Sequence, residues 1–307
     1  PSAPVINSFT ATPDSITAGG SSTLAWTVTG TGTTLSIDNS VGTVTGNSGN
    51  TTVTPATTVT YTLTATNSAG SDTATTTVTV GSGVTASCGD GAATETDPYL
   101  ITDCACLQGL GTESTVNKFY ALVGPINCTE TTTWNGGAGF EPIEDFRGTL
   151  DGRDYTVTGL YINRPSTDKV ALFEEVKNEG TIKNLFMNNV DITGNNYTSA
   201  MVADNYGTMT KVTASGTVVA NGYTTGLLVA ANNGDIIDAY STGSVTGGSV
   251  WTGGLVGVNN DLMRNTYADV NVSGNGETGG LSSNNNGTIE NSFSAGDVSG
   301  SYYTGAF

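Results

Sequence analysis

The stretch "GGLVGVNN" (residues 253–260) decides the fold, because it recurs along the chain at nearly even spacing. Variants stand upstream as "GLLVAANNG" (residues 226–234) and downstream as "GGLSSNNNG" (residues 279–287). The glycines that open successive units follow one another at intervals of 27, 26 and 26 residues, at Gly226, Gly253, Gly279 and Gly305. Two degraded units begin at Ala171 and Ala200. A period in this range predicts a stack of similar structural units.

Each unit contains about three short β-forming runs separated by turn residues, with no helical period of apolar residues. Stacking equivalent runs about 4.8 Å apart, the distance between paired strands, builds a parallel β-helix. One apolar column then aligns through the stack at Phe173, Val202, Leu228, Leu255, Leu281 and Phe307. A second aligns at Ile182, Met209, Ile236, Met263 and Ile289. An aromatic column, interrupted by Thr213, aligns at Phe186, Tyr240, Tyr267 and Phe293.

A polar column runs beside these, at Asn184, Lys211, Asp238, Asn265 and Asn291. Strict alternation along a strand would place the polar and aromatic columns inside, together with the isoleucines. A buried charge without a partner is costly, and a buried ion pair is near neutral at best. We therefore expect the polar column at a corner, with Asn side chains bonded from rung to rung and Lys211 paired with Asp238.

The composition limits the classes of partner. The 307 residues include 27 acidic and 9 basic side chains, a net charge of -18, which disfavours binding to nucleic acid or to anionic membrane surfaces. This acidity is compatible with bound cations or with a salty medium. No stretch approaches the roughly 18 apolar residues of a membrane span, so no direct membrane span is expected. His is absent, so no nucleophile–base pair with His can be built.

Residues 1–82 have a different rhythm, with short alternating strands and many turns that predict a β-sandwich. The stretch "PVINSFTATPDSITAGGSSTLAW" (residues 4–26) resembles bacterial and archaeal immunoglobulin-like modules. The resemblance implies that Leu24 and Leu63 replace the inter-sheet disulfide of antibody domains. Such modules are usually spacers, and the resemblance specifies no ligand.

Four cysteines lie close together, at Cys88, Cys104, Cys106 and Cys128. A zinc site is disfavoured because the closest pair has Cys-x-Cys spacing and no His is present. An even number of cysteines in a chain of extracellular composition predicts two disulfides, and three connectivities are possible.

Residues 88–307 resemble the GLUG family, named for its Gly-Leu-any-Gly core and found in bacterial and archaeal surface proteins, adhesins and some immunoglobulin-A-cleaving metallopeptidases. "DPYLITDCACLQGL" (residues 97–110) and "FRGTLDGRDYTVTGLYIN" (residues 146–163) resemble the segment that precedes such repeats. The resemblance implies a lead-in segment over residues 83–145, which precedes the repeats and is cross-linked by disulfides, and a β-helix over residues 146–307. It also implies the pairs Cys104–Cys128 and Cys88–Cys106. The HExxH motif of the metallopeptidases is missing, so their activity does not carry over.

Two acidic clusters are candidate metal or catalytic sites. The first comprises Glu141, Glu144 and Asp145, followed by Asp151 and Asp154, and the second comprises Asp235, Asp238 and Asp261 on neighbouring rungs. Calcium binding and polysaccharide hydrolysis are two interpretations of such carboxylates. Turn residues and solvated charges are the third interpretation, which we favour. We predict no catalytic residue and no cofactor, with calcium as the cation left open.

Two edges of the stack are candidate contact surfaces. Aromatic residues in the variable tails of the units form a possible ligand edge for glycans or a protein partner, at Tyr223, Trp251, Tyr302 and Tyr303. A further rung opens at the assembly edge Gly305, Ala306 and Phe307. An uncovered rung exposes apolar side chains and unpaired backbone, so we expect self-association or continuation into further repeats.

These features predict an all-β protein, a sandwich followed by a parallel β-helix, located outside the cell or on its surface. We expect a non-enzymatic structural role, as a stalk, a surface-layer component or a head-to-tail filament subunit. One alternative is a carbohydrate- or partner-binding adhesin that uses the variable-tail edge, and a more distant one is a polysaccharide-degrading β-helix enzyme.

Overall fold

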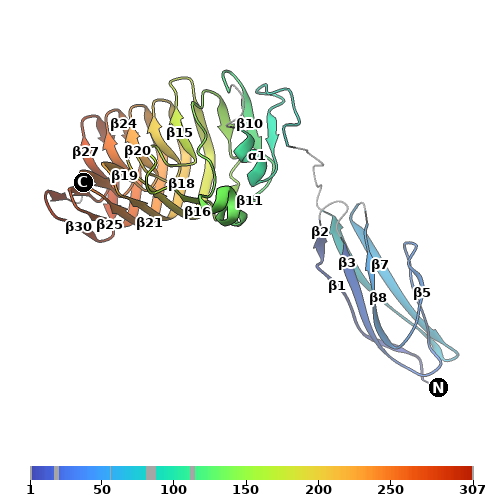
Figure 1. Ribbon diagram of the computed structural model, residues 1–307. Helices are drawn as coiled ribbons and strands as arrows, with labels where there is room; N and C mark the ends of the chain where they lie inside the picture. Colours follow the sequence, from blue (N-terminus) through green and yellow to red (C-terminus); the bar gives the residue numbers. More distant parts are fainter. Residues whose placement is uncertain (1, 17–20, 56, 81–87, 111–114, 306–307) are drawn as a thin grey trace. The chain divides into compact units, whose positions relative to one another are not determined.

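The computed structural model describes residues 2–16, 21–55, 57–80, 88–110 and 115–305 (Figure 1). The chain divides into two compact units, residues Pro1–Thr85 and Ala86–Phe307. The predicted boundary between residues 82 and 83 lies outside the described residues. Within the described part of the chain, no helix has the length and apolar composition needed to cross a membrane.

The first unit consists of two sheets around one hydrophobic core. The smaller sheet is antiparallel, in the order β1 (Val5–Thr12), β3 (Ser22–Thr29) and β6 (Ser48–Val53). The larger sheet has the order β2 (Ser15–Ile16), β8 (Gly70–Val80), β7 (Val59–Asn67), β4 (Thr34–Ile37) and β5 (Gly42–Val44). As the alternating pattern predicts, Leu24, Trp26 and Leu63 are buried between them.

The second unit is a parallel β-helix, so the predicted fold class is confirmed. Its rungs lie side by side from the green strands near β10 to the red strands near β30 (Figure 1). The long sheet has the order β28 (Thr288–Glu290), β24 (Leu262–Arg264), β21 (Asp235–Gly247), β18 (Thr208–Ala220), β16 (Thr181–Gly194), β12 (Thr149–Asp151), β10 (Phe119–Leu122) and β9 (Tyr99–Ile101). Further strands pair beside this path: β11 (Ile126–Asn127), β13 (Thr156–Thr158), β14 (Tyr161–Asn163), β25 (Tyr267–Gly274), β29 (Phe293–Ala295) and β30 (Val298–Gly300).

Two shorter parallel sheets complete the cross-section. The first, which we call the β20 sheet, contains β15 (Phe173–Val176), β17 (Val202–Asn205), β20 (Val229–Asn232), β23 (Val256–Asn259) and β27 (Ser282–Asn285). The second, the β22 sheet, contains β19 (Thr224–Gly226), β22 (Trp251–Gly253), β26 (Glu277–Gly279) and β31 (Thr304–Gly305). From β19 to β28, each repeat supplies one strand to the β22 sheet and one to the β20 sheet before it returns to the long sheet. The two earlier repeats reach the β22 sheet only through the isolated bridges of Val170 with Thr198 and of Thr198 with Thr225.

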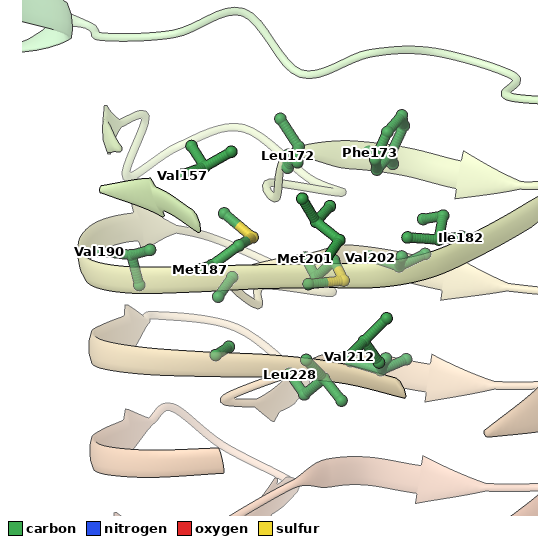
Figure 2. Packing of buried hydrophobic residues seen from close by; sticks show 14 of the residues in the cluster. Val157, Leu172, Phe173, Ile182, Met187, Val190, Met201, Val202, Val212 and Leu228 are labelled. Atoms are coloured by element: carbon green, nitrogen blue, oxygen red, sulfur yellow. The ribbon is translucent and has the colours of Figure 1, made fainter. Parts of the chain in front are cut away.

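The predicted apolar columns occupy the interior, with one correction to the register. Ile182, Met209, Ile236, Met263 and Ile289 pair in the predicted order. In the β20 sheet, however, Val202 pairs with Val229 rather than with Leu228. In the other predicted apolar column, Phe173 and Val202 are therefore offset by one residue from Leu228, Leu255 and Leu281. All five of these residues are nevertheless fully buried. Figure 2 shows Phe173, Ile182 and Val202 directed into this shared core.

The polar column lies at a corner of the long sheet, where its backbone is left-handed. Asn184, Lys211, Asp238, Asn265 and Asn291 all have φ between 49° and 55°. The amide of Asn265 donates to Asp238 at 2.9 Å, so rung-to-rung bonding is confirmed here. The predicted pairing of Lys211 with Asp238 is wrong, because the Lys211 ammonium bonds to Asp154 instead, at 2.7 Å.

Because of the same corner, the aromatic column lies on the outer face and not inside, as strict alternation would place it. A left-handed residue breaks strict alternation, so that Leu185, Val212 and Ala239 point inward directly after it. The aromatic side chains therefore lie on the outer face, where the Tyr240 and Tyr267 rings stack at 4.9 Å. The next pair, Tyr267 and Phe293, lies at 4.3 Å, and the register of this column is as predicted.

The two asparagines of the repeated phrase form two separate ladders. The inner ladder is buried except at its last member, and its amides donate toward the C-terminal rung at 2.7–2.8 Å, from Asn205 through Asn232 and Asn259 to Asn285. The outer ladder donates toward the N-terminal rung at 2.8–2.9 Å, from Asn286 through Asn260 and Asn233 to Asp204. Because a carboxylate only accepts, the direction of the outer ladder is fixed chemically.

The two disulfides cross-link the lead-in segment, whose strands β9 and β10 continue the long sheet from β12. The structure pairs Cys88 with Cys106 and Cys104 with Cys128, the same pairs that the family resemblance implies. Cys104 and Cys106 lie in the short helix α1 (Cys104–Gly109), which Asp103 caps by accepting from the Cys106 N–H at 2.8 Å. Cys128 directly precedes the 3₁₀ segment η2 (Thr129–Gly137).

Replacing Cys104 and Cys128 together by Ser should destabilise the β-helix by about 3 kcal/mol. The bond closes a loop of 24 positions, and loops of this size lose roughly this much when they are opened. Urea denaturation followed by circular dichroism measures the change. An unchanged midpoint, or free thiols in the folded protein, would show that this bond does not hold the lead-in segment.

Candidate functional site

The predicted ligand edge separates into one cavity residue and three surface residues. Tyr223, Tyr302 and Tyr303 are 57%, 76% and 78% exposed. Trp251 is half-buried at the start of β22. Its indole N–H donates to a Glu277 carboxylate oxygen on the next rung at 3.0 Å, which fixes the ring in place. Trp251 is therefore the member of this group that belongs to a formed site.

A cavity of about 320 Å³ lies between the β20 and β22 sheets, and we call it the Trp251 cleft. Its aromatic lining comprises Tyr197, Tyr206 and Trp251. The small side chains of Ala231 and Val258 line it as well. Its polar lining consists of Asp204, Thr224, Asn233, Asn260 and Asn286. Ligand pockets commonly combine apolar walls with a few convergent polar groups, and the volume of this cleft is at the lower end of their range.

The register of the β22 sheet places two aromatic residues at opposite ends of the cleft. Thr224 pairs with Trp251, and the bridge between Thr198 and Thr225 places Tyr197 on the other side of Thr224. Tyr197 has a left-handed backbone, with φ at 55°. Tyr197, Thr224 and Trp251 thus lie on three successive rungs, with the small residue in the middle.

The polar side of the cleft is built around Asp204, which is only 8% exposed. Its carboxylate accepts from the Asn233 amide at 2.8 Å and from the Tyr206 hydroxyl at 3.2 Å, and it lies 3.6 Å from the Lys169 ammonium. Burial raises the pKa of Asp204, and the charge of Lys169 opposes this only in part. These contacts orient the carboxylate toward neighbouring donors.

A network of ion pairs continues from Asp204 to the adjacent strand β15 of the same sheet. Lys169 also contacts Glu175 at 3.1 Å, and Glu175 in turn contacts Lys177 at 2.6 Å. Burial alone would raise the pKa of Glu175, but the hydrogen bonds from Lys177 and Lys169 outweigh it and lower that pKa. Asp204 and Glu175 thus share one cation. This is an arrangement for holding charge in place rather than for releasing a proton.

The acidic cluster considered for calcium does not converge on one point. Glu141 pairs with Arg164, Asp145 with Lys177 at 3.1 Å, and Asp151 with Lys183 at 3.6 Å. Glu144 is exposed. In the described ranges, no group of three or more His, Cys, Asp or Glu side chains is placed to hold a metal ion. Asp151 also accepts from the Arg153 N–H and the Asn184 amide, as expected of a turn carboxylate.

A second hollow of about 280 Å³ lies on the outer face of the long sheet, where Thr213 interrupts the aromatic column. Phe186 and Tyr240 lie at its ends, and Asn188, Ser215 and Thr242 line one side. The Ser215 hydroxyl donates to the Asn188 side-chain oxygen at 2.6 Å. In contrast to the Trp251 cleft, this hollow has no charged side chain in its lining.

Of the predicted assembly edge, only Gly305 is described, and it pairs with Gly279. Ala306 and Phe307 lie outside the described residues. The placement of Phe307 in the apolar column therefore stays a prediction. In the last described rung, Phe293 is 58% exposed and Ile289 is only partly buried.

Tyr197, Tyr206 and Asp204 were missed in the sequence analysis. Tyr197 stands in a variable tail at the position of Trp251, so aligning the tails by rung would have revealed it. Asp204 and Tyr206 belong to a degraded repeat, in which the asparagine phrase reads "DNYG" (residues 204–207). The asparagine phrase is otherwise the most regular part of the repeat, so this change in it was the available sequence signal.

Comparisons with known proteins give partial matches. Over 135 residues, the chain is 39% identical to halomucin from Haloquadratum walsbyi, covering 42% of this chain and 2% of that protein. Over 129 residues, it is 31% identical to a protein from Evansella cellulosilytica named as a Gly-rich membrane protein, covering 40% of this chain and 15% of that protein. The chain thus matches only a small part of the length of either relative. A solved IgA1 protease overlaps 80% of this chain and 23% of its own, with a TM-score of 0.45 and 14% identity. No protein-family model matches the chain.

Proposed function

We propose that this chain is an extracellular, non-enzymatic structural protein of the cell surface, serving as a stalk, a surface-layer component or a filament subunit. The observation that carries the proposal is the unbroken parallel pairing from β9 to the last rungs, cross-linked at its N-terminal end by two disulfides. Such a stack is a rigid spacer, and structural disulfides persist outside the reducing cytosol. The partial likeness to halomucin and to a protein named as a membrane protein also supports a surface location.

The test is to locate the protein and its thiols in the cells that produce it. Antibody against the β-helix should label intact cells or the medium, and a thiol reagent added under denaturing conditions should find the four cysteines oxidised. Imaging of the native particles then separates a filament subunit from a stalk. A cytoplasmic protein with reduced cysteines would contradict the proposal, and monodisperse monomers would remove the filament role.

The second candidate function is a carbohydrate- or partner-binding adhesin, and the Trp251 cleft favours it. A polysaccharide-degrading enzyme has less support. Glycoside hydrolysis needs two carboxyl groups free to act as acid and as base or nucleophile, whereas Asp204 and Glu175 are held by the same lysine.

A further inference from the structure

We propose that the Trp251 cleft binds one ring of a neutral saccharide between the side chains of Tyr197 and Trp251. The proposal rests on the second candidate function and names its ligand class. The structural role on the surface does not depend on it, so each can fail alone.

The spacing of the rungs fits one ring between the two aromatic residues. Tyr197 and Trp251 are two rungs apart, which corresponds to about 9.6 Å. The outer aromatic column gives a measure of ring stacking in this same protein, because the Tyr240 and Tyr267 rings on adjacent rungs lie 4.9 Å apart. In the cleft, the middle rung carries the small residue Thr224 in place of an aromatic residue. The space that an aromatic ring would fill there is open to a ligand.

The cleft also offers hydrogen bonds suited to sugar hydroxyls. The Asp204 carboxylate accepts, and the amides of Asn233 and Asn260 can both donate and accept. Each of these two amides uses one N–H in the outer ladder, and within the described residues the second N–H has no other assigned acceptor. The buried hydroxyl of Thr224 likewise has no partner among those residues, which is a costly arrangement. A polyhydroxylated ring with apolar faces matches both the aromatic ends and the polar side.

The charges select a neutral ring over a charged one. The chain carries a net charge of -18 and Asp204 lies in the cleft, so an anionic sugar would be repelled. A cationic ligand would compete with Lys169, which already contacts the Asp204 carboxylate at 3.6 Å. A neutral ligand leaves this ion pair intact.

The experiment uses the whole chain and saturation-transfer NMR, and the Kd is taken from saturation-transfer titrations, which do not need Trp251 as a reporter. The probes are maltose, cellobiose, lactose and di-N-acetylchitobiose, with glucuronate as the anionic probe and choline as the cationic one. At least one neutral disaccharide should receive saturation and bind with a measurable Kd. Trp251→Ala and Tyr197→Ala should each weaken that binding at least tenfold. Trp251→Phe, which keeps a ring but loses the N–H bonded to Glu277, should weaken it only a few-fold.

Two variants serve as matched controls. Tyr267→Ala removes an aromatic ring of the outer column, and Thr213→Tyr fills the second hollow, and both should leave the Kd within twofold. Circular dichroism confirms that each variant is folded. The proposal is overturned if no neutral saccharide binds, if binding survives Trp251→Ala unchanged, or if choline binds more tightly than every sugar. A loss in Tyr223→Ala equal to that in Trp251→Ala would place the ligand on the exposed edge instead and would also refute the cleft.

Discussion

Replacing Leu255 by Asp is expected to unfold the β-helix at room temperature, with a loss of at least about 5 kcal/mol. Leu255 is fully buried, and its backbone bonds to Leu228 on one side and to Leu281 on the other. A carboxylate at this position would face apolar side chains on both neighbouring rungs and would have no cation to pair with. Ile236→Asp should act in the same way, because Ile236 lies between Met209 and Met263. Thermal and urea unfolding followed by circular dichroism measure the loss.

Matched substitutions separate this effect from a general sensitivity of the repeats. Leu255→Met conserves volume and should cost less than about 1.5 kcal/mol. Asp235→Ala and Glu144→Ala change partly or fully exposed carboxylates and should stay within about 0.5 kcal/mol. If these alanine variants proved as damaging as Leu255→Asp, an acidic site with a bound cation would become the better interpretation.

Replacing Asn232 by Ala should destabilise the β-helix by roughly 3 kcal/mol, although it removes only a small polar side chain. Asn232 is fully buried in the inner ladder, where it accepts from the Asn205 amide and donates to the Asn259 side-chain oxygen, both at 2.8 Å. The substitution takes the amide donor away from Asn259 and the amide acceptor away from Asn205. Because the site is buried, water cannot replace these hydrogen bonds, and their loss lowers the free energy of unfolding without compensation. The free energy of unfolding from urea titration is the measurement.

The outer ladder supplies the control for this result. Asn260 makes the same kind of amide bonds, to Asn233 and from Asn286, but it is exposed. Water can satisfy its neighbours once the side chain is removed, so Asn260→Ala should cost no more than about 0.5 kcal/mol. Equal losses at Asn232 and Asn260 would mean that burial does not determine the contribution of a ladder.

The stacking of the rungs was predictable from the sequence because it depends on repetition rather than on any single contact. When Ile236 and Met263 occupy the same place in successive units, parallel pairing brings them together whatever the shape of the cross-section. The offset between Val202 and Leu228 arose where a degraded repeat meets the regular ones. Asn205 pairs with Asn232 and so carries the correct register, but a displacement of one residue leaves the apolar pattern unchanged and was not recognised.

The side on which the aromatic column lies could not be predicted, because one backbone angle per rung decides it. Asn and Asp adopt left-handed backbone more readily than most residues, and this could have marked Asn265 or Asp238. Lys211 gives no such indication, yet its φ is 54°. Reading the column as a strand with uniform alternation therefore placed Tyr240 and Tyr267 on the wrong side.

The candidate site was only partly foreseen for a related reason. Trp251 could be noticed because a large aromatic residue in a polar tail is conspicuous. The cleft, however, lies where the β20 and β22 sheets adjoin, and the residues that line it come from separate parts of the repeat. Asp204 and Trp251 are 47 positions apart in sequence and line one cavity only because the rung bends between the β22 and β20 sheets.

The two asparagine ladders also determine how the electrostatics of the stack scale with its length. An α-helix aligns its peptide dipoles, so charge builds up at its two ends. Here the inner amides donate toward one end of the stack and the outer amides toward the other, so the dipole moments of the two rows oppose each other in the repeats that carry both asparagines. Backbone carbonyls alternate in direction along each strand and add little. Where a repeat carries both asparagines, these two rows therefore contribute little net axial polarity, however many such repeats are stacked.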